Sequence, residues 1–103
     1  MIYEILRTAK ADEQLRDIIL YIAEDSGDAD VALRYLDKLE KAIMNLSEFP
    51  YIRVKPRYSI LQKQGYWVLI VERHLVFYKV DEVEKAVIVY AVMDSRREYG
   101  NLI

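Results

Sequence analysis

The stretch YWVLIVERHLVFYKVDEVEKAVIVYAVM, residues 66–93, decides the fold of this chain. It contains three runs rich in β-branched and aromatic residues, at 66–72, 75–80 and 86–93. Short polar segments separate these runs, and strands joined by links this short pair in antiparallel fashion. We therefore predict a three-stranded antiparallel meander, although no Asn-Gly or Gly-Gly pair marks either turn.

The residues before this stretch follow a different period. Residues 2–8 alternate as a short strand, and apolar positions then recur at helical spacing. The first helical stripe, within about 10–24, comprises Leu15, Ile18, Ile19 and Ile22. The second stripe, within about 29–47, comprises Ala32, Tyr35, Leu36, Leu39, Ile43 and Leu46. Pro50 ends the second helix, and the short link around Gly27 makes the two helices an antiparallel hairpin.

These elements predict a two-layer α+β fold, in which an N-terminal strand and a helical hairpin pack on a mainly antiparallel β-sheet. We expect one domain over residues 1–103, because this length suffices for a single core. The helices need one face of the sheet for their apolar stripes, and nothing else in the sequence covers the other face. We expect the function to reside on that open face.

The amino-acid composition excludes several kinds of chemistry. The chain has 103 residues and no cysteine, so disulfides, thiolate metal sites and cysteine nucleophiles are ruled out. We expect neither a cofactor nor a metal. The first ten residues lack the basic and apolar regions of a signal peptide, and no apolar run has the length of a membrane span. We expect a cytoplasmic protein with no membrane partner.

Charge is distributed unevenly along the chain. The net charge is −2, but residues 1–50 carry −5 and residues 51–103 carry +3. A basic second half is typical of a surface that meets an anion, and chance scatter of charges on a solvated surface is the alternative. Tyr58 and Tyr66 lie among these basic residues, where their rings would either stack on nucleic-acid bases or simply pack in the fold.

Two further features are candidates for chemistry. The single histidine, His74, falls in an expected hairpin turn, where an exposed turn residue is the simpler interpretation than proton transfer or binding. After the last expected strand, Arg96, Arg97 and Tyr99 stand close together. Guanidinium groups there could bind a phosphate and stabilise its transition state. The alternative is a solvated chain end with a few charged residues.

The order of these parts resembles that of toxins of the RelE/ParE superfamily, also called plasmid stabilisation proteins. The helical matches are Ala11, Leu15, Ile18, Tyr21, Ile22, Ala32, Tyr35, Leu39, Ile43, Leu46 and Pro50. The closing meander resembles that of the family, and Arg96, Arg97 and Tyr99 match its terminal Arg-Arg-x-Tyr pattern. The resemblance implies a toxin of a type II toxin–antitoxin module with a cognate antitoxin as partner.

The resemblance implies three possible activities, of which ribosome-dependent mRNA cleavage is the first prediction and the other two are alternatives. RelE-like toxins cut mRNA on the ribosome without a metal, which would make Arg96, Arg97 and Tyr99 catalytic. The substrate-binding residues would then be Lys55, Arg57, Lys63 and Arg73. ParE-like toxins instead bind DNA gyrase and are not nucleases. A degenerate member would bind only its antitoxin.

Several departures from the nuclease pattern count against RNA cleavage. RelE-type nucleases commonly carry an arginine at the strand position that is Leu75 here, and many relatives carry histidine where this chain has Asp94. Arg73 would share the strand face of Leu75 if the strand were regular, and we expect it to substitute. A net negative charge disfavours docking on a ribosome, and the long helical hairpin is closer to the ParE group.

Overall fold

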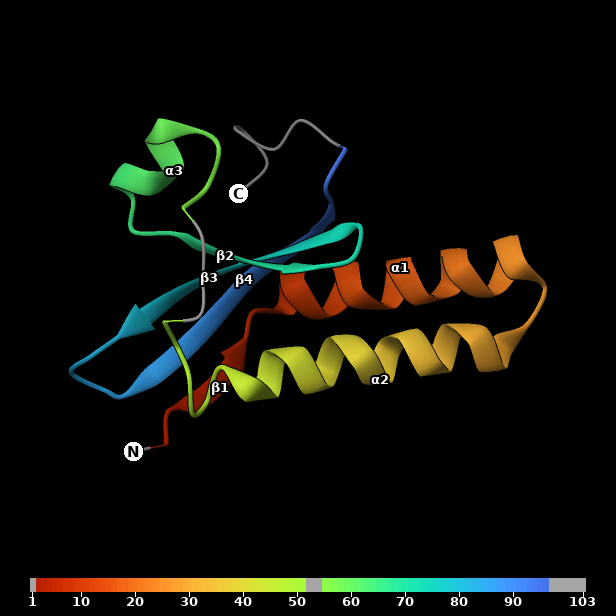
Figure 1. The fold of residues 1–103 in the computed structure, drawn as a ribbon, viewed down its shortest axis with the longest axis horizontal. Coiled ribbons are helices and arrows are strands. Elements are labelled where there is room, and N and C mark those ends of the chain that lie inside the picture. The colour runs from red at the N-terminus through yellow and green to blue at the C-terminus, as the bar shows by residue number, and fades with distance from the viewer. Residues whose placement is uncertain (1, 52–54, 97–103) are drawn as a thin grey trace.

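The computed structural model describes residues 2–51 and 55–96, and it orders them as one strand, three helices and three strands (Figure 1). The strands are β1 (Glu4–Arg7), β2 (Trp67–Val71), β3 (His74–Asp81) and β4 (Ala86–Asp94). The helices are α1 (Ala9–Ser26), α2 (Ala29–Asn45) and α3 (Ser59–Lys63).

The four strands form one mixed sheet in the order β1-β4-β3-β2. The meander pairs antiparallel, with Trp67 opposite Tyr78 between β2 and β3 and Leu75 opposite Met93 between β3 and β4. β1 is the exception, because it lies parallel to β4 at the edge of the sheet. The predicted α+β class, with a helical hairpin on a mainly antiparallel sheet, is confirmed.

The two long helices form the predicted antiparallel hairpin (Figure 1). The Thr8 hydroxyl caps α1 by accepting a hydrogen bond from the Ala11 amide at 3.1 Å. Gly27 ends α1 in the left-handed conformation at φ 69°, and its amide donates to the Ala23 carbonyl. Asp28 then caps α2 through the Asp30 amide at 2.9 Å. Each cap follows from a residue type that the local backbone favours.

The main core lies between this hairpin and one face of the sheet. Val76 and Tyr78 of β3 and Val87 and Val89 of β4 turn toward the helices and are fully buried. The helix residues that meet them are Ala11, Leu15, Leu39, Ile43 and Leu46. The apolar stripes predicted from the sequence therefore supply the contact that holds the layers together.

The opposite face of the sheet is not open, contrary to the sequence-based expectation. Leu61 of α3 is 1% exposed and packs with Leu75, Phe77, Ala91 and Met93 in a second core. A five-residue helix with one buried apolar side chain has no repeating pattern for sequence reasoning to detect.

A β-bulge in β4 adds to the second core. Phe77 pairs with Ala91 and Tyr78 pairs with Val89, which leaves Tyr90 as an extra residue on β4. Tyr90 and Ala91 therefore both turn toward the side of α3. Tyr66 meets Tyr90 edge-on at 5.4 Å between ring centroids, so these tyrosines are packing residues in this structure.

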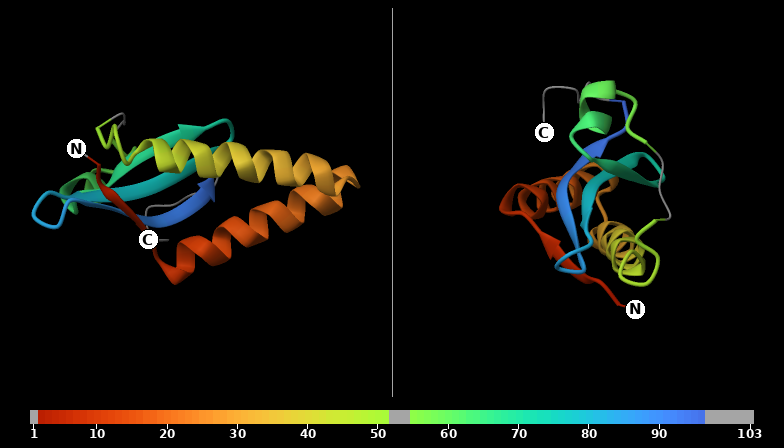
Figure 2. Two further views of the ribbon diagram at one scale, coloured as in Figure 1. Left: turned by 90° about the horizontal axis from the view of Figure 1, so that it is seen from below. Right: turned by 90° about the vertical axis from the view of Figure 1, so that its left-hand side faces the viewer.

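The root of the hairpin is fastened to the sheet, whereas its far end projects beyond it (Figures 1 and 2). The Ser47 hydroxyl donates to the Tyr3 carbonyl at 2.6 Å, and the buried Tyr78 hydroxyl donates to the Pro50 carbonyl at 3.0 Å. No helix within the described residues has the length and apolar character needed to cross a membrane. The projecting half of the hairpin overhangs the ends of β3 and β4, where the candidate site lies.

Candidate functional site

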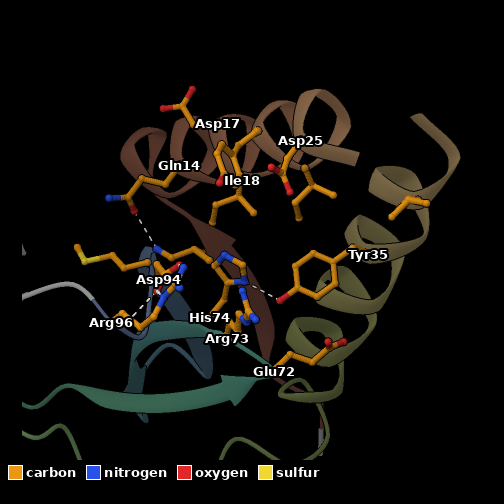
Figure 3. Close-up of a pocket in the computed structure, with 15 residues that line it drawn as sticks. Gln14, Asp17, Ile18, Asp25, Tyr35, Glu72, Arg73, His74, Asp94 and Arg96 are labelled. Atoms are coloured by element: carbon orange, nitrogen blue, oxygen red, sulfur yellow. Dashed lines mark hydrogen bonds and ion pairs between the residues drawn. The ribbon is translucent and has the colours of Figure 1, made fainter. Parts of the chain in front are cut away.

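A cleft of about 650 Å³ lies between the projecting half of the hairpin and one end of the sheet (Figure 3). We call it the hairpin cleft. Its walls come from α1, from Val31 and Tyr35 of α2, from the β2–β3 turn and from the end of β4. Apolar side chains form much of the surface, and charged groups from α1, the β2–β3 turn and the end of β4 surround them. Its apolar residues are Ile18, Ile22, Val31, Val92 and Met93.

The β2–β3 turn places two charged residues at the edge of the cleft. Val71 pairs with His74, so only Glu72 and Arg73 form the turn. Glu72 adopts a positive φ of 50°, a conformation that side-chain-bearing residues rarely take. Its carboxylate meets the Lys38 ammonium of α2 at 2.6 Å. This ion pair connects the turn to α2 at the edge of the cleft.

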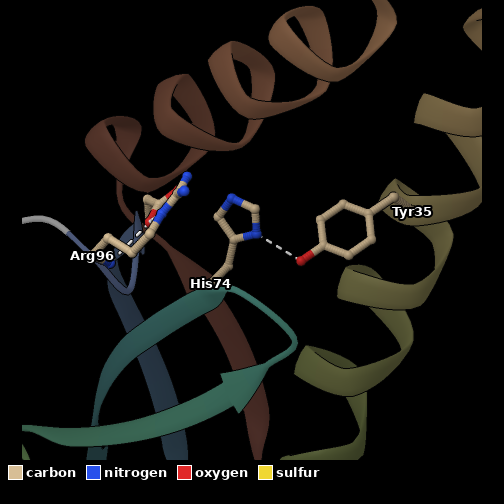
Figure 4. A network of polar contacts seen from close by, with 4 residues as sticks. Tyr35, His74 and Arg96 are labelled. Carbon is tan, nitrogen blue, oxygen red and sulfur yellow. Dashed lines mark hydrogen bonds and ion pairs between the residues drawn. The ribbon is translucent and has the colours of Figure 1, made fainter. Parts of the chain in front are cut away.

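His74 and Tyr35 form a hydrogen-bonded pair across the cleft floor (Figure 4). The Tyr35 hydroxyl lies 2.6 Å from Nδ1 of His74 and 3.1 Å from the Val71 carbonyl oxygen. Because a carbonyl can only accept, the hydroxyl donates its one hydrogen to Val71 and accepts from Nδ1–H. The neutral ring then carries its lone pair on Nε2, and Figure 4 shows this nitrogen turned toward α1.

Burial sets the protonation of this pair. It lowers the pKa of His74, against the opposing effect of the nearby Asp94 and Glu72 carboxylates. Burial also raises the pKa of Tyr35 to about 12, and the Glu72 and Asp94 charges add to that rise. At neutral pH the cleft floor therefore presents a neutral imidazole held by a protonated phenol.

Asp94 and Arg96 form a closed pair at the other end of the floor. The guanidinium donates from Nε to Oδ1 at 3.0 Å and from Nη2 to Oδ2 at 2.9 Å, and the Arg96 amide donates to Oδ1 at 2.8 Å. Hydrogen bonds from Arg96 hold the pKa of Asp94 well below its usual range. The carboxylate stays charged and occupies the guanidinium that would otherwise bind an anion.

Negative charge exceeds positive charge around the hairpin cleft. The carboxylates that line it are Asp17, Asp25, Glu72 and Asp94, and the cations that line it are Arg73 and Arg96. Lys38, which pairs with Glu72, reduces this excess but does not remove it. Within residues 2–51 and 55–96, no group of three or more His, Cys, Asp or Glu side chains is placed to hold a metal ion.

The sequence-predicted site residues separate in space. Arg73 and Arg96 line the hairpin cleft, whereas Lys55, Arg57 and Lys63 do not. Lys63 lies on α3, which covers the other face of the sheet. Arg57 lies over the Tyr58 ring at 5.0 Å from the centroid. Arg97 and Tyr99 lie outside the described residues.

Arg73 also occupies a different position from the one expected. It lies in the turn and not on the strand, while Leu75 faces the second core beside α3. The two residues therefore do not share a strand face, and Arg73 reaches the cleft from the turn.

His74 is the site residue whose setting the sequence analysis missed. The sequence pattern predicts an exposed turn residue, but His74 begins β3 and is half-buried on the helix-facing side. The signal lay in alternation, because His74, Val76 and Tyr78 share one parity and Val76 and Tyr78 face the helices. The two-residue turn before His74 determines which residues of β3 face the helices. It contains no glycine to mark its position, so the register of β3 could not be predicted from the sequence.

Comparison with known proteins agrees with this fold. The toxin–antitoxin complex RelBE2 from Mycobacterium tuberculosis contains a chain with a TM-score of 0.67 and 14% identity, covering 91% of this chain and 92% of that one. A chain of the chromosomal ParDE toxin–antitoxin system of P. aeruginosa gives a TM-score of 0.74 at 15% identity, with 90% and 96% coverage. A mutant of the E. coli toxin RelE in the free state gives 0.61 at 17% identity, with 93% and 86% coverage. These likenesses show that the RelE/ParE toxin fold is shared.

A sequence model of the ParE toxin of the type II toxin–antitoxin system parDE matches residues 5–99. No curated protein sequence matches the chain. Since the match spans nearly the whole chain, the chain belongs to the ParE toxin family of type II toxin–antitoxin systems. The resemblance to the RelE/ParE superfamily is thereby confirmed.

Proposed function

We propose that this protein is a growth-inhibiting toxin that acts in the cytoplasm by binding DNA gyrase and does not cut mRNA. A cognate antitoxin would neutralise it. The observation that carries the choice is the charge of the hairpin cleft, where carboxylates outnumber cations and Arg96 is bound by Asp94. The family membership supports the toxin role, and the cleft supports the non-nuclease mechanism.

Elementary electrostatics gives the reason. A carboxylate and a phosphate about 5 Å apart repel each other by about 3 kcal/mol at an effective dielectric constant of 20. A nuclease site must stabilise the additional negative charge that develops on phosphorus during cleavage. A cleft that already holds a carboxylate excess is poorly suited to that task. A surface that recognises a protein has no such requirement.

Ribosome-dependent RNA cleavage is the second candidate, and one observation favours it. Arg73 makes no ion pair within the described residues, and it lines the same cleft as His74. His74 Nε2 could take the proton of a 2′-hydroxyl as its oxygen attacks the adjacent phosphorus to form a 2′,3′-cyclic phosphate. The P–O5′ bond breaks in the same step, and the leaving O5′ oxygen takes up a proton from water. Arg96, Arg97 and Tyr99 would be catalytic here, and the mRNA would be held by Lys55, Arg57, Lys63 and Arg73.

Inducible expression in a bacterial host tests the proposal, with and without the neighbouring antitoxin gene. We expect growth arrest, a DNA-damage response and unchanged mRNA 5′ ends, all prevented by the antitoxin gene. New mRNA ends at codon boundaries, appearing before any DNA damage, would contradict the proposal and support the nuclease. If new mRNA ends do appear, the Arg73→Ala variant is expressed in the same way. The nuclease mechanism requires this variant to lose RNA cleavage.

A further inference from the structure

We infer that the hairpin cleft receives a cationic side chain, arginine or lysine, from the antitoxin, held between the Asp25 carboxylate and Nε2 of His74. This inference rests on the proposed toxin role and states the chemistry by which the antitoxin would engage this cleft. It concerns the toxin–antitoxin contact and not the gyrase contact, so the two can fail separately.

The α1 wall of the cleft offers an acceptor and an aromatic ring on one helical face. Tyr21 and Asp25 are spaced four residues apart, so their side chains are neighbours on α1. Tyr21 is 67% exposed although it is large and aromatic. Figure 3 shows the Asp25 carboxylate turned from α1 toward the side of Tyr35 and His74. A carboxylate beside an exposed ring suits a guanidinium or ammonium group.

The floor of the cleft offers a second acceptor that does not depend on the carboxylates. Nδ1–H of His74 is used by Tyr35, which leaves Nε2 as an acceptor directed toward α1 (Figure 4). Within residues 2–51 and 55–96, Nε2 has no hydrogen-bond partner and Asp25 has no ion pair. Two unused acceptors thus face one cavity, Asp25 from its α1 wall and Nε2 of His74 from its floor.

The rest of the cleft fits the stem of such a side chain. Ile18, Ile22 and Val31 line it and would cover the methylene groups of an arginine or lysine. A volume of about 650 Å³ is much larger than one side chain, so the segment that carries the cation also has room to enter.

Charge complementarity points to the antitoxin as the source. Residues 1–50, which include the hairpin, carry −5, and the whole chain carries −2. A partner that covers this acidic half closely gains by bringing positive charge. The same carboxylates would repel an anionic partner, such as an RNA phosphate.

The first test uses a small probe on the isolated toxin, followed by NMR at low salt. We expect N-acetyl-arginine amide to shift the Asp25 and His74 resonances in a saturable way, whereas N-acetyl-citrulline amide, its uncharged analogue, does not. Asp25→Asn should weaken the probe by about two- to fivefold, as expected for one partly exposed charge pair. Glu24→Gln makes the same charge change one residue away, outside the cleft lining, and should leave binding unchanged.

The Arg73→Gln variant tests whether the cleft binds a cation or an anion. Removing this cation from the cleft should strengthen the arginine probe, whereas a phosphate site would lose its ligand. Equal binding of the citrulline analogue, equal effects of Asp25→Asn and Glu24→Gln, or weaker arginine binding in Arg73→Gln would each overturn the inference.

The second test uses the antitoxin encoded beside the toxin gene. We expect Asp25→Asn to raise the Kd of the toxin–antitoxin complex and to reduce its salt dependence, with Glu24→Gln as the matched control. If Asp25→Asn weakens the arginine probe but leaves the antitoxin Kd unchanged, the antitoxin does not supply the cation and the inference is overturned. Neither measurement contains gyrase, so both remain valid if the proposed gyrase target is wrong.

Discussion

At the scale of single residues, the contact between Tyr35 and His74 organises the candidate site. One hydroxyl connects α2 to the first residue of β3 and to the last residue of β2. It fixes the tautomer of the ring and thereby decides which nitrogen faces the cleft. The sequence predicts Tyr35 on a helix and His74 in a turn, and it gives no sign that the two side chains meet.

Removal of this hydroxyl by Tyr35→Phe should destabilise the protein. The Val71 carbonyl loses its donor and Nδ1 of His74 loses its acceptor, so we expect the free energy of unfolding to fall by about 1–3 kcal/mol. Urea unfolding measures this change. Tyr21→Phe is the matched control, because Tyr21 is exposed and its loss should cost less than about 0.5 kcal/mol. If the two substitutions lowered the free energy of unfolding equally, the hydrogen bonds of Tyr35 would not contribute to stability.

His74 should also make the stability depend on pH. Its pKa is lowered by burial in the folded chain from an ordinary value of 6.5. The unfolded chain therefore binds more protons in this range, and stability should decrease as pH falls from about 7 through the folded-state pKa. Urea unfolding at stepped pH tests this, and His74→Gln should flatten the dependence above about pH 5.5. Since His74 is the only histidine, an unchanged slope in that variant would refute its assignment.

At the scale of elements, two short segments that carry no periodic pattern complete the fold. The β2–β3 turn sets the register of β3, and α3 covers the sheet face that the hairpin leaves. The long helices and the strands can be predicted because their sequence patterns extend over many residues. The turn and α3 depend on one or two side chains each, so no such pattern predicts them.

The contribution of α3 can be measured with a matched pair of substitutions. Leu61→Ala removes a side chain that is 1% exposed and should lower the free energy of unfolding by about 2–5 kcal/mol. Ile60→Ala changes its neighbour, which is 56% exposed, and should have an effect below about 1 kcal/mol. Thermal or urea unfolding distinguishes them. A small effect at Leu61 would mean that α3 is not part of the core.

At the scale of the whole molecule, the sequence predicted the architecture but not the arrangement of the site. The apolar stripe from Ala32 to Leu46 was predictable because burial on one face of a helix repeats with the helical period. The strand β3 was predictable because it is a continuous run of β-branched and aromatic residues, which are buried on both faces of the sheet. The cleft was not readable, because it depends on how far the hairpin overhangs the sheet. The Asp94–Arg96 pair depends on the conformation of the chain just after β4, and it occupies the guanidinium of Arg96, which the sequence predicted as a phosphate ligand.

The central claim is that this fold, with a carboxylate-rich cleft, acts by binding a protein. The most direct measurement is the supercoiling of relaxed plasmid by purified DNA gyrase, titrated with the purified toxin. We predict loss of supercoiling with increasing toxin and its recovery when the antitoxin is added. Full supercoiling at a large excess of purified toxin would contradict the claim, provided that expression of the same toxin gene still arrests growth.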